Sequence, residues 1–172
     1  MPILPKILIA FAGVPGTSKS PIAHYLSIKL GIPVFSNDVI RTEVKEDLGN
    51  FDFEEYCERR DKRIHEAVER GLSIIYDASA DREWVDRKAV AEKFGYRYFI
   101  ISIDLSRNFI LKLYEAKGYA DLIPEIEKCF DDHEKFLAQF SADVGIHIAD
   151  KDFPNRLEIA LKAVTKWLRS ID

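Results

Sequence analysis

Short runs of apolar residues alternate with longer amphipathic segments along the whole chain. The first run, Ile7-Leu8-Ile9-Ala10-Phe11-Ala12, is apolar throughout, as is typical of a strand buried in a parallel sheet. The amphipathic segments repeat their apolar residues with the helical period, which predicts helices that each bury one face. Strands are expected at 6–12, 32–36, 72–77, 97–103 and 145–149, and helices at 20–30, 38–48, 53–70, 82–94, 106–116, 122–140 and 155–170. This alternation predicts an α/β fold, a parallel sheet with helices on both faces.

Length, composition and charge narrow the class of protein. The chain has 172 residues, of which 47% are hydrophobic, and this favours a single domain over 1–172. A formal net charge of -4 makes general nucleic-acid binding unlikely, because such binding is usually accompanied by a basic patch. No apolar stretch approaches the roughly 20 residues that cross a membrane, and no signal peptide precedes the first expected strand. Cys57 and Cys129 form no C-x-x-C pair, so a reduced, cytoplasmic protein is expected.

The link between the first strand and the first helix is rich in glycine and ends in a lysine and a serine. It reads Gly13-Val14-Pro15-Gly16-Thr17-Ser18-Lys19-Ser20, the phosphate-binding pattern G-x-x-x-x-G-K-[ST] with Ser18 in place of the second glycine. Glycine lets the backbone approach a phosphate, whose oxygens bind the loop N–H groups and the helix N-terminus. Lys19 would reach the outer phosphates, and Ser20 would bind Mg²⁺. The strand-loop-helix context favours this P-loop over an ordinary turn, because a turn requires no lysine-serine pair.

Polar residues follow the other expected strands at the edge where open α/β sheets bind ligands. Asp38 and Arg41 share one expected helix face and suit a proton acceptor and a holder of an anionic acceptor group. On spacing alone, an N-cap aspartate with a surface arginine is the better explanation. Asp77 ends the third apolar strand, as a Mg²⁺-binding carboxylate does, although a turn aspartate takes the same position. Arg107 follows the fourth strand, within reach of a phosphate or simply solvated.

Segment 115–124 is the one stretch that reads as open chain. It follows the fourth strand and its helix, so it is a candidate small lid, with a plain helix–helix connection as an equal alternative. The histidines show no metal-ligand spacing. His133, on the apolar face of the expected helix 122–140, is interpreted as a core histidine without a chemical role.

Together these motifs resemble those of the small P-loop kinases of the adenylate-kinase-like group, and more narrowly the AAA-domain predicted kinases related to zeta toxin and polynucleotide kinase. The family loop G-x-P-G-x-G-K-S corresponds to residues 13–20, its Ser/Thr-x-Asp-x-x-Arg motif to 36–41, and its Asp-Ala strand end to Asp77-Ala78. The resemblance implies a P-loop NTPase fold with strand order 2-3-1-4-5. It also implies ATP and Mg²⁺, with phosphoryl transfer to a hydroxyl of a small-molecule or nucleotide-like acceptor. Asp38 would activate that hydroxyl, and Arg41 would hold the acceptor.

Two features depart from the family pattern. Ser18 places a Cβ where the family has a glycine against the phosphates. Lids of such kinases usually supply arginines, one of which contributes about 10³–10⁵ in rate. Residues 108–155 contain no arginine, which leaves the cations at Arg107, Lys112 and Lys117, with Arg82 or Arg87 as substitutes. Two alternatives to a kinase therefore stay open: a nucleotide-binding or interaction protein without phosphoryl transfer, and a nucleoside-triphosphate hydrolase.

Overall fold

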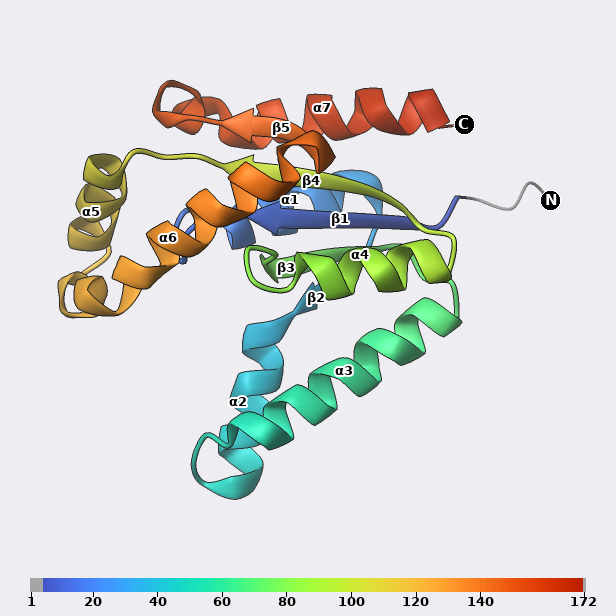
Figure 1. The fold of residues 1–172 in the computed structure, drawn as a ribbon, viewed down its shortest axis with the longest axis horizontal. Coiled ribbons are helices and arrows are strands. Elements are labelled where there is room, and N and C mark those ends of the chain that lie inside the picture. The colour runs from blue at the N-terminus through green and yellow to red at the C-terminus, as the bar shows by residue number, and fades with distance from the viewer. Residues whose placement is uncertain (1–4, 172) are drawn as a thin grey trace.

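The computed structural model describes residues 5–171, which are built around one parallel sheet (Figure 1). Its strands are β1 (Ile7–Ala12), β2 (Val34–Ser36), β3 (Ile74–Ser79), β4 (Arg97–Ile103) and β5 (Val144–Ile148). Hydrogen bonds join them in the order β2-β3-β1-β4-β5, and every pair is parallel. The predicted sheet and its strand order are confirmed. β3 runs on to Ser79, so Asp77 lies within this strand, paired with Ser36 of β2.

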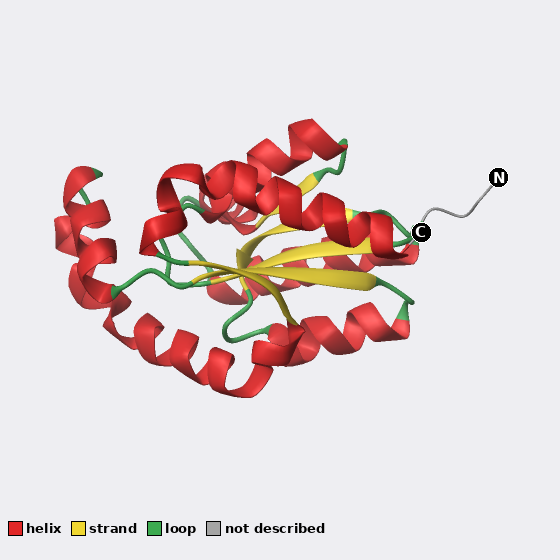
Figure 2. Ribbon diagram, turned by 90° about the horizontal axis from the view of Figure 1, so that it is seen from above, coloured by secondary structure: helices red, strands yellow, loops and turns green. Residues whose placement is uncertain are grey.

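Helices cover both faces of the sheet, as Figure 2 shows. They are α1 (Lys19–Leu30), α2 (Asn37–Leu48), α3 (Phe53–Glu69), α4 (Trp84–Lys93), α5 (Arg107–Ala116), α6 (Ile123–Phe140) and α7 (Arg156–Ile171). Between residues 5 and 171 the chain also forms three short 3-10 helices that the sequence pattern did not predict: η1 (Ala120–Leu122), η2 (Ser141–Asp143) and η3 (Asp150–Asn155). None of the described helices combines the length and apolar character that crossing a membrane requires.

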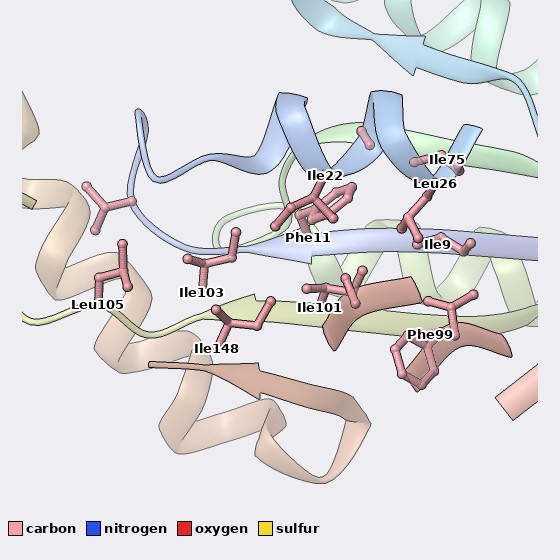
Figure 3. Close-up of a cluster of buried hydrophobic side chains, with 14 of the residues drawn as sticks. Ile9, Phe11, Ile22, Leu26, Ile75, Phe99, Ile101, Ile103, Leu105 and Ile148 are labelled. Atoms are coloured by element: carbon pink, nitrogen blue, oxygen red, sulfur yellow. The ribbon is translucent and has the colours of Figure 1, made fainter. Parts of the chain in front are cut away.

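Alternate residues of β1 point to opposite faces of the sheet, and each set belongs to a separate part of the core. Ile9 and Phe11 pack with Ile22 of α1 and with residues of α7 (Figure 3). Leu8 and Ala10 pack on the other face with residues of α3, α4 and α6. Every residue of β1 is therefore buried, which explains why the strand is apolar throughout instead of alternating.

All five strands end at the same edge of the sheet, because they are parallel. The glycine-rich loop leaves β1 there, α2 leaves β2 and α5 follows β4. In Figure 1, α5, η1 and the start of α6 extend beyond this edge, and α2 with α3 forms a separate arm. The candidate lid at 115–124 comprises the end of α5, a turn, η1 and the start of α6. The elements that carry the candidate residues thus surround one end of the sheet.

Candidate functional site

The loop between β1 and α1 turns through two glycines that have positive φ angles, 133° at Gly13 and 78° at Gly16. A Cβ on Gly13 would lie 2.9 Å from the carbonyl oxygen of Ile103, and one on Gly16 would lie 2.7 Å from a ring carbon of Tyr114. Both positions therefore exclude a side chain by conformation and by space. The first part of the motif has the residues that its backbone path requires.

Ser18, at the position of the missing glycine, adopts a left-handed conformation with φ 82° and ψ 21°. Among the described residues it is the only one besides glycine with a positive φ. This conformation costs an L-residue roughly 1–2 kcal/mol. The Ser18 hydroxyl accepts a hydrogen bond of 2.6 Å from Nε of Arg156, at the start of α7. The serine therefore takes the backbone conformation that a glycine adopts freely, with its side chain tied to another helix.

Lys19 is folded back onto the loop. The residue is 9% exposed, and its Nζ donates to the carbonyl oxygens of Gly13 at 2.8 Å and Val14 at 2.7 Å. Burial lowers the pKa of Lys19 to about 8, against the opposing effect of the Asp81 and Asp77 carboxylates. An ammonium group has three donors, and two of them are used here. Lys19 also lines the cleft described below.

Ser20, at the start of α1, contacts Asp77, in the second half of β3. The Ser20 hydroxyl donates to Oδ1 of Asp77 over 3.1 Å. Burial raises the pKa of Asp77, although the hydrogen bond from Ser20 opposes this. Mg²⁺ favours oxygen ligands and is usually held by one or two carboxylates together with substrate phosphates. A hydroxyl beside a single carboxylate, next to a loop with the phosphate-binding pattern, is a donor set that fits this ion.

A cleft of about 780 Å³ adjoins the loop. The loop side contributes Lys19 and Ser20, and the facing wall contributes Asp38 and Arg41 of α2 and Tyr56 of α3. Nε of Arg41 lies 3.9 Å from Oδ1 of Asp38, and its guanidinium lies 4.6 Å from the Tyr56 ring centre. The Asp38 side chain is 89% exposed. The structure therefore brings both predicted acceptor-side residues to the same cleft as the loop.

Of the cations named from the sequence, Lys117 and Arg82 line the cleft, whereas Arg107 does not. Nζ of Lys117 donates to the Gly16 carbonyl oxygen over 2.5 Å, and Lys117 lines the cleft. Arg82 also lines it and pairs with Asp132 at 2.6 Å. Arg107 is not among the lining residues, and its guanidinium pairs with the Glu127 carboxylate, with Nη1 at 2.7 Å. The structure thus separates Arg107 from the other predicted site residues and puts Lys117 on the loop.

Sequence reasoning missed a buried ionic network behind the loop. Asp81, in the turn after β3, accepts the N–H of Gly13 at 3.1 Å. His133 of α6 bridges this carboxylate, at 3.2 Å, and that of Asp104, at 2.9 Å. Burial lowers the pKa of His133, but its hydrogen bonds to Asp104 and Asp81 outweigh burial and raise it to about 9. The histidine that the sequence analysis placed in the core is therefore buried and bridges two carboxylates, one of which contacts the loop.

Ser106 caps α5, since its hydroxyl accepts the N–H of Phe109 at 3.2 Å. Besides His133, the Asp104 carboxylate is contacted by Nδ1 of His147 and by the Ser102 hydroxyl. No spacing rule connects Asp81, Asp104 and His133, which come from separate segments of the chain. The available signal was a histidine at an otherwise apolar helix position, and that signal does not identify the partners.

No protein-family model matches the chain, and no curated protein matches it in sequence. Solved structures do match its fold. A gluconokinase from Sinorhizobium meliloti 1021 is 13% identical, with a TM-score of 0.64 over 98% of this chain and 95% of that one. The APS kinase of Mycobacterium tuberculosis, in complex with AMPPNP and APS, is 16% identical, with a TM-score of 0.60 over 94% and 99%.

A shikimate kinase from Bacteroides thetaiotaomicron is 13% identical, with a TM-score of 0.60 over 95% of this chain and 98% of the other. Each likeness spans nearly the full length of both chains, so it concerns the whole fold and not the loop alone. At these identities the comparisons establish the fold, which this chain shares with these three kinases.

Proposed function

We propose that this chain is an ATP-dependent kinase, which transfers the γ-phosphoryl group to a hydroxyl of a small-molecule or nucleotide-like acceptor. The observation that carries the proposal is the cleft itself. It brings the loop residues Lys19 and Ser20, with Asp77, to the same space as Asp38 and Arg41. A phosphate-binding loop facing a carboxylate and an arginine is the arrangement that phosphoryl transfer to a hydroxyl needs.

Each residue has a distinct part in the proposed reaction. Lys19 and the loop N–H groups bind the phosphates, and Ser20 with Asp77 would hold Mg²⁺, which neutralises charge on the phosphates when bound. Asp38 accepts the proton of the acceptor hydroxyl, whose oxygen forms a bond to the γ-phosphorus as the bond to the β–γ bridging oxygen breaks. Arg41 holds an anionic group of the acceptor, and Lys117 is the nearest lid cation to the loop.

The matched structures support the reaction class. Three of them are kinases by name, and one is a complex with AMPPNP. Their acceptors differ, since they are a gluconokinase, an APS kinase and a shikimate kinase. The fold therefore supports the nucleotide half of the proposal and leaves the acceptor to be found by screening.

Thermal unfolding with and without Mg-ATP tests the nucleotide half. A ligand at about a hundred times its Kd stabilises the fold by about 2.7 kcal/mol, a shift of roughly 5–10 °C for a domain of this size. Lys19→Ala should abolish the shift, because it removes the only buried ammonium group that faces the cleft within residues 5–171. Lys29→Ala, an exposed position on the same helix, is the matched control and should keep the full shift.

Release of ADP in the presence of candidate acceptors tests the other half. Turnover that requires an acceptor supports the kinase. ADP release at the same rate without any acceptor would instead make the chain a hydrolase. Nucleotide binding without turnover for any hydroxyl-bearing acceptor would favour the binding-protein alternative.

A further inference from the structure

Ser18 stands at the N-cap of α1, a position where serine normally accepts a hydrogen bond from the N–H groups of the first helical turn. Here its side chain makes no such cap. The hydroxyl is turned toward α7 and bound by Arg156. The N–H groups at the start of α1 are thus left free of Ser18, at the place where a phosphate-binding helix needs them.

Arg156 is itself held in place by contacts with η3. Its Nη1 donates to the carbonyl oxygen of Phe153 over 2.9 Å, and its guanidinium lies 4.2 Å from the centre of the Phe153 ring. Within residues 5–171 no carboxylate forms an ion pair with it. A fixed arginine whose Nε reaches 2.6 Å from the Ser18 hydroxyl gives this side chain a defined partner outside the loop.

Without that partner, Ser18 has a competing local option. Its hydroxyl can accept the N–H of Ser20, since Pro21, the next residue of the first turn, has no N–H to offer. An N-cap serine of this kind has an extended backbone rather than a left-handed one. The same change would therefore occupy a phosphate-binding N–H group and turn the peptide groups beside Ser18 away from their present directions.

We propose that Arg156 is a positioning residue of the phosphate-binding loop, needed because residue 18 is serine instead of glycine. It fixes the Ser18 hydroxyl outside the loop and so keeps the left-handed turn, and with it the N–H groups of α1, ready for the nucleotide. The inference rests on the nucleotide-binding half of the proposed function. It makes Ser18 and Arg156 a unit that replaces one glycine.

A double-substitution cycle tests this dependence with Mg-ATP as the probe. The Kd is measured by calorimetry for the unsubstituted protein, Arg156→Ala, Ser18→Gly and the combined variant. Arg156→Ala should weaken binding about tenfold, which corresponds to about 1.4 kcal/mol. Ser18→Gly should bind at least as tightly as the unsubstituted protein. The combined variant should bind like Ser18→Gly, within about twofold, because a glycine at position 18 has no hydroxyl for Arg156 to hold.

Two controls separate positioning from general damage. Arg169→Ala removes the same charge from an exposed position of α7 and should leave the Kd unchanged. If Arg156→Ala lowers the melting temperature without nucleotide, Arg156→Met takes its place in the cycle. The methionine keeps an aliphatic side chain in contact with Phe153 but lacks the guanidinium. A purely structural role would lower the melting temperature of both Arg156 variants and leave the affinity of the folded protein unchanged.

Two results would overturn the proposal. Equal affinities of Arg156→Ala and the unsubstituted protein for Mg-ATP would show that the loop does not depend on Arg156. A combined variant as weak as Arg156→Ala would show that the guanidinium acts on the nucleotide directly and not through Ser18. Failure of the unsubstituted protein to bind Mg-ATP is a different outcome, because it would contradict the nucleotide-binding function on which the role of Arg156 rests.

Discussion

The two walls of the cleft are built differently. On the loop side, Lys19 is 9% exposed and held by hydrogen bonds of 2.7 and 2.8 Å. On the facing side, the side chains of Asp38 and Arg41 are 89% and 46% exposed and lie 3.9 Å apart. The loop side is therefore buried and held by short hydrogen bonds, whereas the polar groups of the facing side are more exposed and make a longer contact. Substitutions on the two sides should therefore change different measured quantities.

Asp38→Asn should have the largest effect, and only on turnover. General-base catalysis contributes about 10²–10⁴ in rate, so acceptor-dependent ADP release should fall by that factor. The Kd for Mg-ATP should stay within about twofold of the unsubstituted value, because Asp38 makes no hydrogen bond to the loop. Asp86→Asn, an exposed carboxylate in the first turn of α4, is the control. Unchanged turnover in Asp38→Asn would show that Asp38 is not the general base.

His133→Gln should change the pH dependence of stability, which is a property of the loop side. His133 has a folded pKa of about 9, above its ordinary value of 6.5, so its ion pairs stabilise the fold fully below about pH 6.5. That contribution, on the order of 3 kcal/mol, is lost as pH rises through about 9. The free energy of unfolding of both proteins is measured by urea titration between about pH 6 and 10.

Lys19 makes the comparison with the variant necessary. Burial lowers the pKa of Lys19 from its ordinary value of 10.5 to about 8. The contribution of this residue to the free energy of unfolding therefore increases as the pH rises from about 8 to 10.5. That slope has the opposite sign to the slope from His133 in an overlapping window. The difference between the unsubstituted protein and His133→Gln isolates the histidine and should shrink toward high pH. A difference that is constant with pH would mean that His133 is neutral in the folded protein.

Paired glycine substitutions compare the packing at the loop with that at the C-terminal end of α2, the helix that carries Asp38 and Arg41. Gly16 and Gly49 have nearly the same φ, 78° and 74°, but only Gly16 has atoms where a Cβ would stand. Alanine at either position costs roughly 1–2 kcal/mol of left-handed strain. Gly16→Ala adds a clash with Tyr114 worth about 1–3 kcal/mol more. Urea unfolding measures both, and equal losses would show that Tyr114 moves away freely.

The parts of the site that sequence predicted are those whose signal is local. The loop 13–20 is continuous in the sequence, and Asp77 is found because it lies near the end of an apolar strand. The strand order was predicted from the resemblance to P-loop kinases, and the helices from the period of their apolar residues. The roles given to Lys19, Asp38, Arg41 and Arg107 stay predictions.

What sequence did not predict depends on contacts between distant segments. Arg156 and Ser18 are separated by 138 positions, and His133 lies 52 positions from Asp81. Apolar spacing locates a buried face but does not say which polar groups from other elements will meet there. Buried polar groups require such partners, so this information appears only once the segments are packed.

Arg41→Ala should have the smallest effect on stability, and it sharpens the contrast between the two sides. An exposed ion pair of this kind contributes at most about 1 kcal/mol, and an exposed cation–π contact about 0.5–1 kcal/mol. The free energy of unfolding should thus fall by about 1 kcal/mol, with the Kd for Mg-ATP unchanged and the KM for the acceptor raised. Lys45→Ala, exposed on the same helix, should change none of these. If Arg41→Ala instead weakens Mg-ATP binding as much as acceptor binding, Arg41 belongs to the phosphate side and the cleft does not divide as proposed.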